Sequence, residues 1–192
     1  YLETRRKLGG RAAAGGLDLG ESRPQQLWEK AAGEADMPIR WHLVGHLQRN
    51  KVKHLDRFVM FHALDSERLA EAIAERVQGA GRSCAVLLQL NTSGEGSKGG
   101  FTPAQLPAVA RTMRGFEGVR VKGVMTMAPF EADEAILRST FGRCREALPV
   151  LCDAGHEATE LSMGMSGDYE VAVEEGATMV RLGTILFGTR VP

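Results

Sequence analysis

The regular alternation of short β-rich runs with longer amphipathic segments constrains the fold of this chain more than any other feature. The segment 66–78, for example, carries Leu69, Ile73 and Val77 at four-residue spacing, which predicts a helix with one apolar face. Strict alternation of strand and helix is typical of a parallel sheet. The seven strand candidates are residues 17–21, 41–45, 58–64, 84–91, 119–127, 159–163 and 179–183.

Two further segments predict long helices. Residues 102–114 begin with Thr102 as an N-cap and Pro103 at the first helical position. Residues 131–148 place apolar side chains, among them Phe141, on one face. We therefore expect each segment to pack one apolar stripe on the sheet.

Seven parallel strands leave two architectures open, an open doubly wound sheet and an eight-stranded (β/α)8 barrel, or TIM barrel. Residues 1–14 predict a loop and a helix, so the strand of that unit would precede Tyr1. With 192 residues, the chain falls just short of the about 200 to 250 residues of a complete barrel. We therefore predict a single-domain α/β barrel over residues 1–192, with its first strand missing from the sequence.

The final motif, at 161–188, predicts where such a barrel would bind a ligand. It reads as a strand, a glycine-serine loop, a short helix, a strand and a glycine-threonine turn. Gly164 and Gly183 leave backbone amides uncovered, and the hydroxyls of Ser166 and Thr184 can donate to phosphate oxygens. Since the loops after the last two strands are the usual phosphate site of a barrel, a phosphorylated ligand is indicated.

An arginine at position 181 shares a strand face with the second of these turns and adds one inward cation. Both features have plainer interpretations. Ser166 or Asp168 can simply cap the short helix, and Arg181 can form a buried ion pair with Glu160 or Glu21. The residues alone leave these alternatives open.

Composition argues against several classes of partner and site. The 24 lysines and arginines balance 24 acids with no run of like charges, so we expect neither a nucleic-acid nor a membrane partner. The apolar runs are far shorter than the about 20 residues that span a bilayer. Three cysteines without a CxxC pair fit a reducing cytoplasm, and five histidines without an HExxH pattern predict no metal site. We expect a monomer, since no long apolar stripe demands an oligomer.

Four segments indicate more than the fold class, because they match motifs of a known family: WHLVGHLQRNK at 41–51, FHALDS at 61–66, LNTSGEGSKGGF at 90–101 and LSMGMSGDYEVAVEEGATMVRLGTILFG at 161–188. Together they resemble the pyridoxal phosphate homeostasis protein family, in the order of that family's motifs and over nearly the whole chain. The resemblance implies a barrel like the N-terminal domain of alanine racemase. It also implies pyridoxal 5'-phosphate (PLP) as the cofactor, bound at the C-terminal ends of the strands.

The resemblance assigns roles to individual residues. Ser166, Gly183 and Thr184 would hold the phosphate, and Arg181 would face the pyridine nitrogen. A permanent cation there disfavours protonation of the ring and so weakens PLP as an electron sink. Further cofactor contacts would come from Ser22, His62, Met163 and Gly164.

Three of these further contacts have alternatives. Ser22 stands where the family typically has an asparagine, and its side chain is shorter. His62, like His42, alternates with apolar neighbours and either lines the pocket near the ring or is a hydrogen-bonded core histidine. Met163 either packs on the ring or fills the core.

The family's Schiff-base lysine ends the first strand, in a pattern of valine, serine or threonine, and lysine. Tyr1 matches the residue immediately after it, and no lysine of this sequence occupies that position. We expect the lysine to precede Tyr1 in the natural protein.

The resemblance implies a PLP-binding protein of vitamin B6 homeostasis that is not an enzyme. It would carry PLP as a lysine aldimine without committed turnover, with PLP-dependent apo-enzymes as candidate recipients. One alternative is a PLP-dependent racemase or decarboxylase, which would need a second acid-base group. The other is a barrel enzyme acting on a sugar phosphate without PLP, for which Glu21 and Glu160 are the candidate bases.

Overall fold

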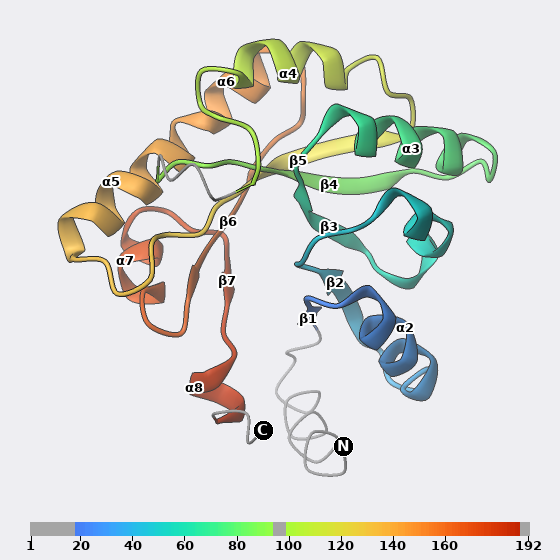
Figure 1. Cartoon of the computed structure of the whole chain (residues 1–192), viewed down its shortest axis with the longest axis horizontal. Coiled ribbons are helices and arrows are strands. Elements are labelled where there is room, and N and C mark those ends of the chain that lie inside the picture. The colour runs from blue at the N-terminus through green and yellow to red at the C-terminus, as the bar shows by residue number, and fades with distance from the viewer. Residues whose placement is uncertain (1–17, 94–98, 189–192) are drawn as a thin grey trace.

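The computed structural model describes residues 18–93 and 99–188, which form one parallel sheet curved into most of a barrel (Figure 1). The strands pair strictly in chain order, and every neighbouring pair is parallel. A doubly wound sheet would reverse its strand order part-way, so that alternative is wrong and the barrel is confirmed. The strands are β1 (Asp18–Glu21), β2 (Arg40–Leu43), β3 (Met60–Leu64), β4 (Cys84–Gln89), β5 (Val119–Met125), β6 (Glu160–Met165) and β7 (Met179–Arg181).

The sheet forms an arc that runs from β1 round to β7 (Figure 1). Among the described residues, β1 pairs only with β2, and β7 pairs only with β6. The helix predicted within residues 1–14 lies outside the described residues. The strand predicted before Tyr1 therefore stays a prediction.

Helices lie outside the arc and cover it (Figure 1). In α3, the predicted apolar stripe of Leu69, Ile73 and Val77 is buried, with at most 4% of any of these residues exposed. The stripe packs in the core between sheet and helices. The helical elements are α2 (Pro24–Gly33), the 3-10 helix η1 (Arg49–Arg57), α3 (Glu67–Gln78), α4 (Leu106–Met113), α5 (Glu134–Arg145), α6 (Ala147–Asp153), α7 (Tyr169–Glu174) and α8 (Thr184–Phe187).

Helix α4 begins at Leu106, later than the predicted start at residue 103. The predicted cap is nevertheless present, because the N–H of Thr102 donates to Gln105 Oε1 at 2.9 Å and the N–H of Gln105 donates to Thr102 Oγ1 at 3.3 Å. This is the reciprocal pattern of a capping box. The first turn uses tighter bonds, such as Leu106 N–H to the Pro103 carbonyl at 3.2 Å, so regular α geometry starts after it.

The helix predicted over residues 131–148 is in fact two helices, α5 and α6. Helix α5 begins after Asp133, whose side chain accepts a hydrogen bond from Ile136 N–H at 2.8 Å. It ends at Arg145 because Pro149 has no N–H for the carbonyl four residues earlier, with which its ring would also clash. Pro149 is instead accommodated in the first turn of α6. The apolar periodicity continues past this proline, which is why the prediction missed the break.

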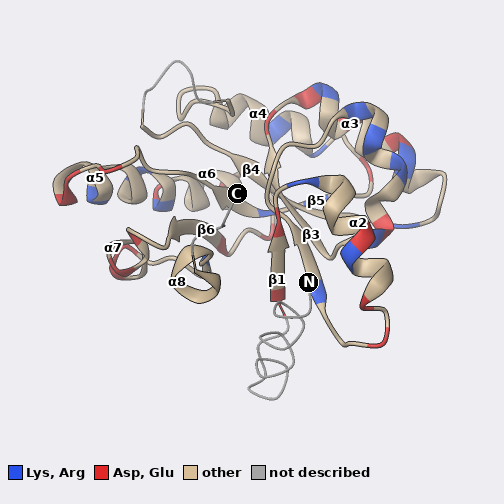
Figure 2. Ribbon diagram, turned by 60° about the horizontal axis from the view of Figure 1, so that its bottom comes forward, with Lys and Arg blue, Asp and Glu red and all other residues tan. Residues whose placement is uncertain are grey.

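Charged residues of both signs lie along the outer helices, including α2, α3 and α5 (Figure 2). Within residues 18–93 and 99–188, no helix is long and apolar enough to cross a membrane. The same residues contain no group of three or more His, Cys, Asp or Glu side chains that could hold a metal ion.

Candidate functional site

The loops after β6 and β7 meet at the C-terminal end of the sheet. Ser166 Oγ, from the first loop, accepts hydrogen bonds from the N–H groups of Gly183 at 3.1 Å and Ile185 at 3.4 Å. Two backbone amides from one turn therefore converge on a single oxygen atom. Converging amides are a common way to bind an anionic oxygen. The structure thus brings together Ser166 and Gly183, as predicted, in what we call the amide cup.

The amide cup is open to a ligand. A Cβ atom added to Gly183 or Gly167 would meet no other atom within 4 Å. Thr184 is exposed beside Gly183, as the first residue of α8. Gly164 differs, because its φ is +90° and a Cβ there would lie 2.6 Å from Ala172 Cβ. Gly164 therefore lets α7 pack closely on β6 and so places the loop.

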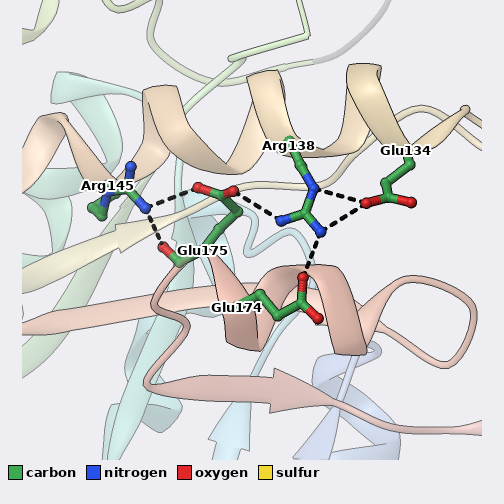
Figure 3. A network of polar contacts seen from close by, with 5 residues as sticks. All are labelled: Glu134, Arg138, Arg145, Glu174 and Glu175. Atoms are coloured by element: carbon green, nitrogen blue, oxygen red, sulfur yellow. Dashed lines mark hydrogen bonds and ion pairs between the residues drawn. The ribbon is translucent and has the colours of Figure 1, made fainter.

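Helix α7, which follows the Ser166 loop, is tied to α5 by an ion-pair network on the surface (Figure 3). Arg138 Nε donates to Glu134 Oε1 at 2.8 Å, and its two terminal nitrogens reach Glu174 and Glu175. Arg145 Nη1 donates to Glu175 Oε2 at 2.8 Å and to the Glu175 carbonyl at 3.1 Å. These contacts join the end of α7 to α5 at the surface.

The side chain of Arg181 points into the barrel. Its Nη1 donates to the carbonyl and the Oγ of Ser162, both at 2.8 Å, and its Nη2 donates to the Thr126 carbonyl at 2.9 Å. Burial lowers the pKa of Arg181 to about 10, although the charges of Asp168 and Cys144 act to raise it. The guanidinium therefore remains a cation at neutral pH.

The alternative ion pair of Arg181 with Glu160 or Glu21 is wrong. Glu160 Oε2 accepts from Thr178 Oγ1 at 2.8 Å, and Glu21 pairs with Lys30. Burial acts to raise the pKa of Glu21, but the hydrogen bonds from Lys30 and from backbone N–H groups lower it below its ordinary value. Arg181 has no ion-pair partner among the described residues, so its charge is met by neutral acceptors.

His62 lies inside the barrel and is bonded at both ring nitrogens. Its Nδ1 is 2.9 Å from Ser162 Oγ, and its Nε2 is 2.8 Å from His42 Nδ1. Only 3% of His62 is exposed. Burial, together with electrostatic interactions with His42 and Arg181, lowers the pKa of His62 to about 3. His62 is therefore a neutral, hydrogen-bonded core histidine, and its contact with a ligand ring stays a prediction.

Sequence reasoning did not select Asp18 and Ser162, which also belong to this interior group. His42 Nε2 is 2.8 Å from Asp18 Oδ1 at the start of β1. A signal was available, because His42, His62 and Ser162 each stand between apolar or aromatic neighbours within a strand. Polar residues at such positions must find partners inside the fold.

The two remaining predicted contacts are Ser22 and Met163. Ser22 is exposed at the end of β1, where its N–H donates to Glu21 Oε1 at 2.8 Å. Met163 is fully buried and follows Ser162 in β6, so the two side chains point to opposite faces of the sheet. This position suits the core-filling interpretation of Met163.

A separate hollow of about 440 Å³ lies where β2 and β3 end, lined by residues 46–49, 65–66 and 68–69. There His46 Nδ1 lies 3.1 Å from Asp65 Oδ2, and the side chain of His46 is 67% exposed. Residues 46–49 of the motif at 41–51 therefore line this hollow, and none of them belongs to the amide cup.

Residues 16–191 match the family model of the alanine racemase N-terminal domain. The pyridoxal phosphate homeostasis protein of Pseudomonas aeruginosa is 39% identical over 179 residues, covering 93% of this chain and 76% of that protein. The protein of the same name from Deinococcus radiodurans is 43% identical over 181 residues, covering 91% and 79%. The chain belongs to the pyridoxal phosphate homeostasis protein family.

Solved structures of similar proteins have the same fold as this pyridoxal phosphate homeostasis family member. PipY from Synechococcus elongatus without PLP has a TM-score of 0.88 and 36% identity, covering 95% of this chain and 87% of PipY. The PLP-bound form has a TM-score of 0.82 and 35% identity, with the same coverage. Alanine racemase from Clostridium difficile, with a TM-score of 0.74 and 17% identity over 90% of this chain and 45% of its own, shares the barrel fold.

Proposed function

We propose that this protein binds PLP at the ends of β6 and β7 and serves PLP homeostasis by holding the cofactor rather than by turning over a substrate. The observation that carries the proposal is the amide cup, which opens two residues beyond the partly buried cation of Arg181. The PLP-bound structure of PipY and the names of the curated relatives support this ligand and this role.

The amide cup suits the phosphate of PLP. The N–H groups of Gly183 and Ile185 already share one oxygen, so a phosphate oxygen can take the same bonds. The hydroxyls of Ser166 and Thr184 would add two donors. Asp168, the nearby acid, accepts a hydrogen bond from the Met165 N–H within its own loop. Its charge is thereby partly satisfied and is compatible with an anion in the cup.

Arg181 suits the ring end of the ligand. PLP supplies a reactive aldehyde and a ring that can act as an electron sink when its nitrogen is protonated. Because Arg181 keeps its charge at neutral pH, a guanidinium facing that nitrogen would disfavour the protonation. These residues therefore favour holding PLP over using it in catalysis. The lysine that would join PLP covalently stays a prediction.

The phosphate contacts can be tested with two ligands. The double variant Ser166→Ala, Thr184→Val should bind PLP more weakly by about 2 to 4 kcal/mol, or roughly 30-fold to 1,000-fold, as two hydrogen bonds to a charged group are lost. Pyridoxal, which lacks the phosphate, should bind both proteins equally. Spectroscopic titration measures each affinity.

Ser93→Ala is the matched control, since Ser93 Oγ bonds to Asn91 Oδ1 in the loop after β4, outside the cup. An unchanged PLP affinity in the double variant, or an equal loss for pyridoxal, would contradict the phosphate assignment. The holding role has its own test, which is incubation of the PLP-loaded protein with L-alanine. Sustained racemisation would refute that role.

A further inference from the structure

A continuous line of hydrogen bonds crosses the barrel interior from β1 to β7. It runs from Asp18 Oδ1 through His42 and His62 to Ser162 Oγ and Arg181 Nη1, with each of its four links between 2.8 and 2.9 Å. Asp18 belongs to β1 and Arg181 to β7, so the line links the first and last strands of the described sheet. We call this line the interior relay.

The positions of the protons in the interior relay follow from its two ends. Ser162 Oγ accepts from Arg181, and because Ser162 is fully buried its own proton needs an acceptor. His62 Nδ1 is that acceptor, so the proton of His62 sits on Nε2 and is donated to His42 Nδ1. The proton of His42 then sits on Nε2 and is donated to the Asp18 carboxylate. Every donor has a partner in this arrangement.

The reverse arrangement is costly. A proton on His62 Nδ1 would point at Ser162 Oγ, which already accepts from the guanidinium, and the buried hydroxyl proton would lose its acceptor. His42 would have to donate from Nδ1, and keeping its bond to Asp18 would make it a second cation close to Arg181. A low-dielectric interior penalises both changes.

The favoured direction also suits the charges at the two ends. Each imidazole turns its lone pair toward the guanidinium and its N–H toward the carboxylate, so the chain of dipoles stabilises both ions. Other charged or titratable groups face these ends, namely Arg40 on β2 beside Asp18, and the Asp168 carboxylate and the neutral Cys144 thiol near Arg181. Arg181 therefore depends on neutral acceptors, of which the relay orients Ser162 Oγ.

We propose that Asp18, His42 and His62 are positioning residues that orient the Arg181 guanidinium through the interior relay and so couple β7 to β1. The relevance of this coupling to PLP rests on the function proposed above. The relay itself is a property of the protein without ligand, and it can be tested in that state.

Nitrogen NMR of the histidine rings tests the direction of the relay in the PLP-free protein. We expect His42 and His62 to be neutral at pH 7, each with its proton on Nε2. A proton on His62 Nδ1 would overturn the proposal.

The variant Asp18→Ala tests the coupling. It should shift the ring-nitrogen signals of His62, which does not touch Asp18, and speed the solvent exchange of the Arg181 guanidinium protons. Arg40→Gln, which removes the other partner of Asp18 among the described residues, should change neither readout. Asp18→Asn keeps an acceptor without its charge and should shift the same signals by a smaller amount. It replaces Asp18→Ala in this test if that variant folds poorly. Unchanged His62 and Arg181 signals in both Asp18 variants would refute the relay.

Adding PLP tests whether the coupling reaches the ligand. The absorption maximum of bound PLP should shift in Asp18→Ala and stay in place in Arg40→Gln. An unshifted spectrum in Asp18→Ala would overturn the positioning role toward PLP. If the parent protein binds no PLP, that result contradicts the proposed function instead. The NMR signals of the PLP-free protein would still show whether the relay exists.

Discussion

The interior relay and the surface network between α5 and α7 each join five residues, but they lie in opposite environments (Figure 3). In the surface network, the Arg138 side chain is 40% exposed, and its partners Glu134 and Glu174 are 67% and 59% exposed. In the relay, at most 8% of His42 is exposed, and Ser162 is fully buried. Only the outer end of the relay, Asp18, reaches solvent freely.

The difference shows that the number of charges in a polar network does not measure its contribution to the stability of the fold. Water can replace a lost partner of Arg138, and dissolved salt screens its attraction to the glutamates. A lost partner in the relay leaves a buried donor or acceptor without any replacement. We therefore expect the neutral imidazoles to matter more for stability than the ion pairs on the surface.

The largest expected effect separates two histidines, one buried and one exposed. His62→Ala should lower the free energy of unfolding by roughly 2 to 4 kcal/mol, because it leaves a cavity and leaves hydrogen-bonding groups of His42 and Ser162 without partners. His46→Ala removes a histidine that is also bonded to a neighbour, but at an exposed position, and should cost far less. Urea unfolding measures both. Equal losses of unfolding free energy in the two variants would contradict the expected difference between the buried and the exposed environment.

A second prediction concerns pH. The pKa of His62 is about 3 in the folded protein, below its ordinary 6.5, so between these values the unfolded chain binds a proton that the native protein does not. This contribution to stability is fully present above pH 6.5 and is lost as the pH falls toward 3. The slope reaches about 1.4 kcal/mol per pH unit.

His62→Gln lacks this titration, so the difference in unfolding free energy between parent and variant should narrow on acidification. Urea titrations at several pH values between 4 and 7 measure that difference. A constant difference over this range would mean that His62 is not held neutral by burial.

The smallest effect is expected at the surface. Arg138→Gln should lower the melting temperature slightly at low salt and less at high salt, because its ion pairs with Glu134 and Glu174 are exposed and screened, although Glu175 is only 16% exposed. Lys122→Gln, which removes a single exposed pair with Glu157, should do less still. Thermal melts at two salt concentrations measure both. A large, salt-independent loss in Arg138→Gln would show that the network is structural after all.

The sequence predicted the fold well where local patterns decide it. All seven strand candidates correspond to strands, because short β-rich runs bounded by loops are a local signal. The errors fall where one residue overrides a pattern, as Pro149 does by dividing the helix predicted over 131–148. The late start of α4 has a similar origin, in a tight first turn after its cap at Thr102.

The candidate site was predicted in part. Ser166 and Gly183 come from one continuous motif with a recognisable order of glycines and hydroxyls, and the structure brings them together. The partners of Arg181 could not be predicted, and the two carboxylates considered for it bond elsewhere. Its real partners are backbone carbonyls and a serine hydroxyl, which carry no distinctive pattern in a sequence.

By itself, the sequence determined the alternation of strands and helices, the motif at 161–188 and the family resemblance, since all of these lie in local order along the chain. Only the tertiary structure decided the interior relay. Its links join residues 24, 20, 100 and 19 positions apart, and they form because the curvature of the sheet brings the inner faces of distant strands together. Buried polar groups then bond to one another because no water is available to them.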